Sequence, residues 1–199
     1  MTAPKHITLH GGDPSPCKAA LLLIDVINDM EFDGGAKLKK YAAPAAKRIA
    51  ALKRRAKVLG IPIIYANDNF GRWQSDFHKQ VRHCLEDGVR GESVARMLIP
   101  EEDDYFVLKP RHSAFFSTTL GILLKHLGTE TLILTGFASN LCVLYTANDA
   151  YMHDFTVYVP RDCIAAELPV NHQRAIAHMA RYLKADTRAA ARIPLKRLL

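Results

Sequence analysis

The amino-acid sequence predicts an α/β fold in which helices cover both faces of a parallel sheet. Several short segments are apolar throughout, such as the centre of KAALLLIDV at residues 18–26, and this pattern is typical of strands buried on both faces. They alternate with longer segments whose apolar residues recur at helical spacing, which favours parallel strands joined by crossover helices. The chain has 199 residues, 49% of them apolar, which suits one domain with a sizeable core. We therefore expect a single domain over residues 1–199, with its core at about 18–185.

Five strands are expected where these apolar runs occur. The expected strands cover residues 18–26, 61–66, 105–108, 131–134 and 155–159. A short strand near residues 186–192 is a further candidate. Because the sequence shows no internal repeat and no linker, we expect all the strands to form one sheet.

Four longer helices are expected between or after these strands. They cover residues 44–59, 117–127, 140–151 and 170–183. Pro44 suits a first helical turn, Ser117 suits an N-cap, and Gly60 and Gly128 suit helix ends. Residues 67–100 have weaker periodicity, and we expect them to form a substrate-side loop with one or two short helices.

The charge of the chain does not point to a nucleic-acid partner. The formal net charge is +7, from 27 Lys and Arg against 20 Asp and Glu, but the charges are spread along the chain. The two densest clusters, at residues 37–40 and 53–57, belong to one predicted helix region. We expect them to form a solvated helix face rather than a binding patch.

The cysteines and the hydropathy pattern predict a cytoplasmic protein. The four cysteines lie far apart and form no CxxC pair, so reduced thiols are expected. The N-terminal segment MTAPKHITLHGGDPSP has no apolar core of a secretory signal. No apolar run approaches the ~20 residues that span a bilayer. We expect no membrane partner and no cofactor.

Three chemically useful side chains are expected at one edge of the sheet. Ligands of such folds bind beyond the carboxyl ends of the strands. Asp25 follows the first strand, Lys109 follows the third, and Cys142 follows the fourth at the start of a helix. A carboxylate can accept a thiol proton, and a lysine or a helix N-terminus can stabilise a thiolate. Together they favour a cysteine nucleophile, although each alone also fits an ordinary role as a turn acid, a surface ion pair or a small buried residue.

The motifs around these residues resemble those of the isochorismatase-like cysteine hydrolases, the family that includes nicotinamidases and N-carbamoylsarcosine amidase. They read LLLIDVINDM around Asp25, VLKPRHSAFFSTTL around Lys109 and LILTGFASNLCVLYTANDAY around Cys142. The resemblance covers about residues 18–183, and the order of the three motifs makes it specific. It implies a three-layer αβα fold with a parallel sheet of about six strands.

The resemblance also implies a catalytic triad of Asp25, Lys109 and Cys142. Cys142 would attack an amide or related carbonyl carbon and form a thioester, which water then cleaves. Asp25 would take the thiol proton and pass it to the leaving group, and Lys109 would hold the thiolate form. Family members have a non-proline cis peptide before the cysteine, which maps here to Phe137-Ala138. The N–H groups of Ala138 and Cys142 would then form an oxyanion hole.

The metal site of the nicotinamidase branch is not expected in this chain. That branch carries a D-x-H pattern after the second strand, whereas this chain has Asp68 but Phe70 at the histidine position. His78 and His83 follow without an evident ligand spacing, and we expect both to be exposed. The sequence therefore predicts no bound metal.

Candidate substrate-binding residues come from the loops above the same edge of the sheet. They are Phe32, Asn67, Asn69, Trp73, Phe115, Phe137 and Tyr145. Trp73 is the preferred substrate wall, with a core or interface aromatic as the alternative, and the two asparagines also fit structural roles in their loop. The expected partners are a small-molecule substrate and further copies of the chain in a dimer or tetramer, as is common in the family.

The favoured activity is metal-independent hydrolysis of a C–N bond in a small amide, ureido or carbamoyl compound. Two alternatives remain open. One is hydrolysis of a vinyl ether of the isochorismatase type, in which Asp25 acts as the acid and Cys142 is incidental. The other is a binding or assembly module that kept the fold without turnover.

Overall fold

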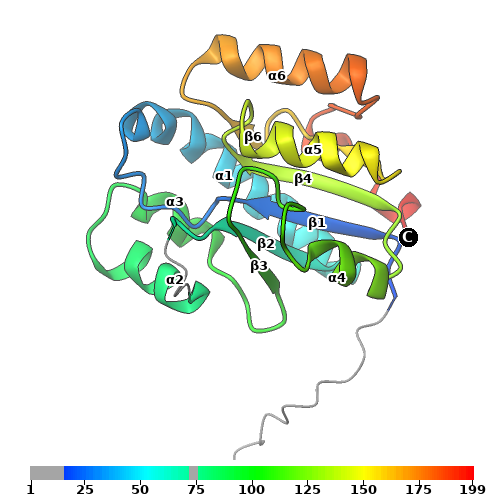
Figure 1. The fold of residues 1–199 in the computed structure, drawn as a ribbon, viewed down its shortest axis with the longest axis horizontal. Helices are drawn as coiled ribbons and strands as arrows, with labels where there is room; N and C mark the ends of the chain where they lie inside the picture. The colour runs from blue at the N-terminus through cyan, green and yellow to red at the C-terminus, as the bar shows by residue number, and fades with distance from the viewer. Residues whose placement is uncertain (1–15, 72–75) are drawn as a thin grey trace, which may run out of the picture.

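One parallel sheet forms the centre of the molecule (Figure 1). The computed structural model describes residues 16–71 and 76–199, so Trp73, the preferred substrate wall, lies outside the described residues. The strands of the described chain are β1 (Ala19–Ile24), β2 (Ile63–Asp68), β3 (Tyr105–Lys109), β4 (Thr131–Phe137), β5 (Thr156–Tyr158) and β6 (Ile164–Ala165). Their order is β3-β2-β1-β4-β5, and β6 pairs with the end of β4.

The central strand, β1, pairs in parallel with both of its neighbours and is buried. Leu22 of β1 lies opposite Ile64 of β2 and Leu134 of β4, and all these pairings are parallel. Every residue of β1 is buried, as its continuous apolar sequence predicts. The predicted α/β fold with a parallel six-stranded sheet is therefore confirmed.

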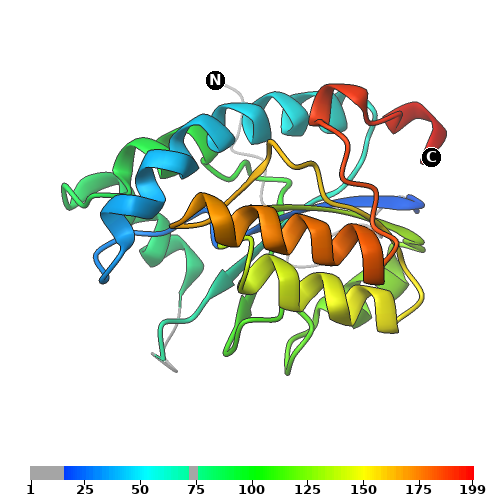
Figure 2. The ribbon, with the colours of Figure 1, turned by 90° about the horizontal axis from the view of Figure 1, so that it is seen from above.

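Helices cover both faces of this sheet and complete three layers (Figure 2). They are α1 (Gly35–Val58), α2 (Phe77–Glu86), α3 (Glu92–Ala95), α4 (Leu120–His126), α5 (Cys142–Met152) and α6 (Pro169–Tyr182), with 3₁₀ turns at Arg96–Leu98, Ala190–Arg192 and Leu195–Arg197. Leu21 and Leu23 of β1 pack with Ile49 on the face of α1. Leu22 of β1 and Val143 of α5 belong to the second core, which α4, α5 and α6 cover. Alternate side chains of one strand thus supply two separate cores.

The first helix begins nine residues before its predicted start at Pro44. Pro44 therefore lies inside α1 rather than in its first turn. A proline in a helix removes the N–H that would bond the carbonyl four residues earlier, here that of Lys40. Both Lys40 and Pro44 are exposed, so water can serve the freed carbonyl. Buried Leu38 and Ala42 anchor the added turns to the core.

Two further elements differ from the sequence prediction. Ser117 does not cap α4, because its φ of 53° is left-handed and an N-cap residue needs extended backbone. The candidate strand at 186–192 is reduced to a single parallel bridge between Tyr158 and Asp186, followed by a 3₁₀ turn. The sixth strand is instead β6, whose two residues are too short to produce a periodic signal.

The basic cluster at residues 53–57 is not a solvated helix face. Lys53 is 5% exposed, and its Nζ lies 2.6 Å from an Asp104 carboxylate oxygen and 3.1 Å from the Tyr65 hydroxyl. Lys57 pairs with Asp104 and Asp103, and Arg55 donates to the carbonyls of Ala190 and Ile193. The acidic partners come from the turn before β3, which local sequence patterns do not reveal. These ion pairs tie α1 to the sheet.

In the part of the chain that the structure describes, no helix combines the length and the apolar character needed to cross a membrane.

The buried pair of Lys53 and Asp104 predicts a large and specific loss of stability. Asp104→Asn should lower the free energy of unfolding by about 3 kcal/mol, because it leaves the Lys53 charge without its buried counter-ion. Urea denaturation followed by circular dichroism measures this change. Asp103→Asn is the matched control: that side chain is 79% exposed, and its loss should cost at most about 1 kcal/mol. Equal effects of the two substitutions would contradict the assignment.

Candidate active site

The three side chains predicted for catalysis meet at the carboxyl edge of the sheet. Asp25 directly follows β1, Lys109 ends β3, and Cys142 begins α5 after β4. The Lys109 Nζ lies 2.9 Å from an Asp25 carboxylate oxygen and 3.5 Å from the Cys142 Sγ. The Cys142 thiol is also hydrogen-bonded to the Asp25 carboxyl. Acid, ammonium and thiol thus form one contiguous cluster.

The backbone fixes the position of Asp25. Its N–H donates to the Ala66 carbonyl, and its second carboxylate oxygen accepts the Asp68 N–H at 2.7 Å. Its φ of 51° is left-handed, a conformation that aspartate tolerates better than most residues. Gly136 of β4 passes so close that a Cβ there would lie 2.0 Å from the Ile24 carbonyl oxygen. Glycine at 136 therefore allows β4 to approach β1 next to Asp25.

Burial controls the charges of this cluster. Lys109 has no exposed surface, and burial acts to lower its pKa, but the negative charge of Asp25 and the neighbouring groups outweighs burial and raises it. Burial raises the pKa of the Asp25 carboxyl, and the Lys109 ammonium offsets only part of this effect. A carboxylate with a raised pKa is a better proton acceptor than an ordinary aspartate.

The surroundings of Cys142 favour its thiol form at rest. The pKa of Cys142 is raised to about 12, because burial and the charge of Asp25 together outweigh the opposing effect of the Lys109 ammonium. The Lys109 ammonium alone is therefore not enough to ionise this half-buried sulfur. The thiol proton has to move to a base during reaction, and Asp25 is in hydrogen-bond contact with it.

The N–H groups of Ala138 and Cys142 lie where the loop after β4 joins α5. The peptide bond between Phe137 and Ala138 is cis. The Ala138 carbonyl accepts the N–H groups of Leu141 and Val143, and the Ser139 N–H donates to the Ala165 carbonyl at 2.7 Å. Among the described residues, no backbone carbonyl accepts the N–H of Ala138 or of Cys142.

Three predicted substrate-binding residues have structural positions instead. Phe137 is 1% exposed and packs in the core on the α1 face, because alternate residues of β4 point to opposite sides of the sheet. Asn67 is fully buried, and its amide donates to the Ile27 carbonyl, which ties β2 to the loop after β1. The Phe115 ring stacks on His153 and contacts Phe155 beyond the C-terminal end of α5. Cys142 lies at the opposite end of that helix, roughly 15 Å away along its axis.

The remaining predicted substrate residues lie in loops or on the surface. Asn69 accepts the Gly71 N–H through its side chain and donates its own N–H to the Lys109 carbonyl. Phe32 is 40% exposed in the loop before α1, and Tyr145 is 51% exposed one turn after Cys142. The two aromatic side chains are therefore accessible to a ligand, whereas Asn69 shapes the loop beside Lys109.

His112 contacts the thiol, although it is not among the residues predicted from the sequence. Its Nδ1 lies 3.7 Å from the Cys142 Sγ, and its ring lies 5.4 Å from that of Tyr145. The signal was present, since His112 stands three residues after Lys109 within the motif around that lysine. Asp68, considered only as a remnant of a metal site, also contributes, because its carboxylate lies 3.5 Å from the Lys109 Nζ.

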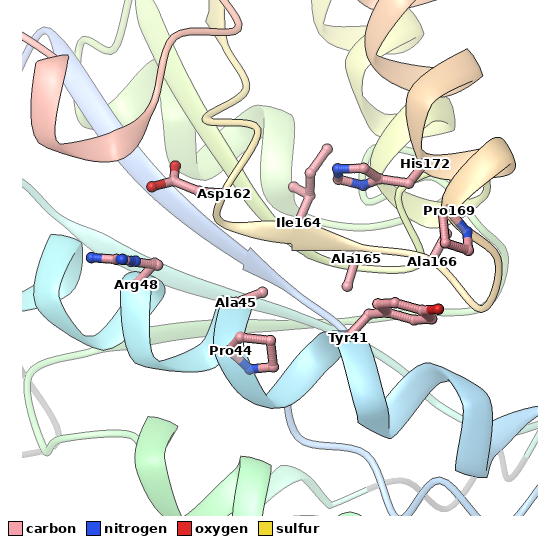
Figure 3. A pocket seen from close by; sticks show the side chains of 10 residues that line it. All are labelled: Tyr41, Pro44, Ala45, Arg48, Asp162, Ile164, Ala165, Ala166, Pro169 and His172. Carbon is pink, nitrogen blue, oxygen red and sulfur yellow. The ribbon is translucent and has the colours of Figure 1, made fainter.

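A separate cavity of about 280 Å³ lies between α1 and the segment that runs through β6 into α6 (Figure 3). Tyr41 and Arg48 of α1 line one side, and Asp162 and His172 line the other. The His172 Nδ1 lies 3.3 Å from the Ser139 Oγ, so the cavity adjoins the loop before α5. None of the three clustered residues lines it, and we do not assign it as the substrate pocket.

Comparison with known proteins identifies the family. The isochorismatase domain model matches residues 19–190. The chain belongs to the isochorismatase family. An uncharacterized isochorismatase family protein of Bacillus subtilis, YaaI, is 40% identical over 172 residues, which cover 86% of this chain and 94% of that protein. A probable inactive nicotinamidase of Arabidopsis thaliana is 34% identical over 170 residues, which cover 80% of this chain and 87% of that protein.

A solved structure shows the same fold. The crystal structure of N-carbamoylsarcosine amidase from Thermoplasma acidophilum has a TM-score of 0.69 at 23% identity, covering 89% of this chain and 99% of the other. The resemblance predicted from the three motifs is confirmed, and the chain is an isochorismatase-family hydrolase.

The histidines near the second strand of this isochorismatase-family chain are engaged by other groups. The two ring nitrogens of His83 lie 2.7 Å from Asp87 and 3.4 Å from Asp29, and the His78 ring packs edge-on against Phe106. In residues 16–71 and 76–199, no three His, Cys, Asp or Glu side chains are grouped closely enough to hold a metal ion.

The raised pKa of Cys142 predicts slow alkylation at rest. At pH 7, iodoacetamide should label Cys142 more slowly than a model thiol with the ordinary pKa of about 8.5, because less thiolate is present. Asp25→Asn should accelerate labelling, since it removes the negative charge next to the sulfur. Peptide mass spectrometry that quantifies the Cys142 adduct measures both rates, and buried Cys163 in the same sample serves as an internal control. Labelling of the unmodified protein faster than the model thiol would contradict the resting thiol.

Proposed function

We propose that the chain hydrolyses a C–N bond in a small amide, ureido or carbamoyl compound, with Cys142 as nucleophile and without a metal. The observation that carries this proposal is that the buried Lys109 ammonium contacts both the Cys142 thiol, which gives up a proton, and the Asp25 carboxylate, which accepts it. The Lys109 Nζ lies 2.9 Å from Asp25 and 3.5 Å from the Cys142 Sγ. A thiol, a base within hydrogen-bond reach and a cation are the parts that nucleophilic catalysis at a carbonyl requires.

In the first half-reaction, the thiol proton moves to Asp25 as Sγ attacks the carbonyl carbon. The negative charge on the carbonyl oxygen is held by the N–H groups of Ala138 and Cys142, which have no carbonyl partner among the described residues. The C–N bond then breaks, and the leaving nitrogen takes the proton from Asp25. The products are a free amine or ammonia and a thioester on Cys142.

Lys109 supports this step electrostatically. Its ammonium is buried beside both Asp25 and the sulfur, in surroundings where charges interact more strongly than in water. When negative charge develops on Sγ, the lysine is already in place, and no solvent has to reorganise. Lys109 is also held by the Arg111 carbonyl at 3.3 Å, which fixes the direction of the ammonium.

In the second half-reaction, water attacks the thioester carbon and the C–S bond breaks. The product is a carboxylic or carbamic acid, and the thiol of Cys142 is restored. The accessible aromatic side chains of Phe32 and Tyr145 are our candidates for substrate contact. A homo-oligomer and a cytoplasmic location remain predictions of the sequence analysis.

A substrate panel with variants tests the proposed function. We expect one or more small amides, ureides or carbamoyl compounds to be hydrolysed, and Cys142→Ala and Asp25→Asn to lose at least ~10³-fold in kcat, because each removes a member of the reacting pair. Release of amine or ammonia is the measured quantity. Cys84→Ala is the control, since that buried thiol of α2 lies outside the cluster and its loss should leave kcat unchanged.

The same panel separates the alternatives. Cleavage of isochorismate without hydrolysis of any amide would favour the vinyl-ether reaction. No turnover at all would favour a binding module. Full turnover by Cys142→Ala would contradict the proposed nucleophile.

A further inference from the structure

We propose that His112 is a further catalytic residue, the general base that activates water for cleavage of the thioester. This inference rests on the proposed function, because it assigns a role in its second half-reaction. The carrying observation is the distance of 3.7 Å between the His112 Nδ1 and the Cys142 Sγ. A group at this distance from the sulfur also lies close to an acyl carbon bound to that sulfur.

His112 and Asp25 both lie next to the Cys142 sulfur, but they differ in their exposure to solvent. Asp25 is 5% exposed, and its two carboxylate oxygens are engaged by the Asp68 N–H and the Lys109 ammonium. His112 is exposed to solvent. The buried acid is therefore placed to exchange a proton with the thiol and the leaving nitrogen. The exposed imidazole is placed to receive a proton from water that arrives from solvent.

The loop that carries His112 is anchored at both ends of the histidine. On one side, the Arg111 carbonyl accepts a bond from Lys109. On the other, Ser113 donates to the Asp149 carboxylate, and the Ala114 N–H donates to the Thr146 hydroxyl at 3.0 Å. Both acceptors belong to α5, the helix that begins with Cys142. His112 and Cys142 are thus both held in place through α5. The imidazole therefore stays within reach of the sulfur, as a general base requires.

The aromatic neighbour further restricts the imidazole. Tyr145 stands one turn after Cys142 on α5, and its ring lies 5.4 Å from the His112 ring at an interplanar angle of 51°. Such tilted aromatic contacts are favourable. The ring is therefore packed from one side while its Nδ1 faces the sulfur.

The proposed step balances in protons and bonds. A water molecule adds to the thioester carbon, and its proton passes to a ring nitrogen of His112. The tetrahedral intermediate collapses with cleavage of the C–S bond, which releases the acid product. The imidazolium of His112 then returns the proton to the Cys142 sulfur. The resting thiol and the neutral imidazole are both restored, and no other reactant is needed.

An activated ester separates the two half-reactions without knowledge of the natural substrate. With 4-nitrophenyl acetate, the initial burst of nitrophenolate reports acetylation of Cys142, and the steady-state rate reports hydrolysis of the acetyl thioester. For His112→Gln we expect a burst rate within threefold of the unmodified protein and a steady-state rate at least tenfold lower. Removal of a general base typically costs ~10²- to 10⁴-fold. Acetylated Cys142 should accumulate, as peptide mass spectrometry would show.

A rescue experiment distinguishes catalysis from a merely structural role. Added imidazole should restore steady-state hydrolysis by His112→Ala in a concentration-dependent manner, because a free base can occupy the vacated space. A role in packing alone would not respond to imidazole. His153→Gln is the matched control: this histidine stacks on Phe115 beyond the far end of α5, and its loss should leave both phases unchanged.

The outcomes distinguish this inference from the proposed function. A steady-state rate of His112→Gln within twofold of the unmodified protein would overturn the role of His112 while leaving Cys142 as nucleophile. An equal fall of burst and steady-state rates, without rescue by imidazole, would overturn it as well. Absence of acetylated Cys142 in the unmodified protein, with Cys142→Ala equally active on the ester, would overturn the proposed function and this inference together.

Discussion

The buried ion pair between Lys109 and Asp25 is the constraint on which the site depends. Lys109 has no exposed surface, and its ammonium is stable there because the Asp25 carboxylate lies 2.9 Å away. Loss of either partner would leave an uncompensated buried charge, a change that typically costs about 3–5 kcal/mol. The ends of β1 and β3 must therefore stay in register with each other. β2 lies between them and pairs in parallel with both, which maintains that register.

The same ion pair controls the protonation of the Cys142 sulfur beside it. Because burial and the Asp25 charge keep Cys142 protonated at rest, the nucleophile forms only when its proton moves to Asp25. A thiolate is therefore formed during the reaction rather than held permanently. On its solvent side the sulfur meets His112, which belongs to a loop anchored to α5. Acylation and hydrolysis of the thioester are thereby assigned to two different bases that contact the same sulfur.

The sequence predicted what depends on local pattern and strand order, and it missed what depends on distant partners. The apolar run of β1 and the polar residues after each strand predicted the sheet and the meeting of Asp25, Lys109 and Cys142. Burial of Lys53 could not be predicted, because its partner Asp104 is supplied by a remote turn. Phe115 was misplaced because its loop runs along α5 away from the cysteine. The resting thiol required the depth of burial, which no spacing in the sequence reveals.

Trapping the covalent intermediate tests the central claim of a cysteine nucleophile most directly. Protein mixed with a hydrolysed amide or carbamoyl compound is quenched in acid within the first turnover, digested and analysed by mass spectrometry. We predict that the acyl group of that compound appears on the peptide containing Cys142, and that hydroxylamine removes it as expected for a thioester. Rapid formation of product with no adduct on Cys142, at quench times shorter than one turnover, would contradict the account.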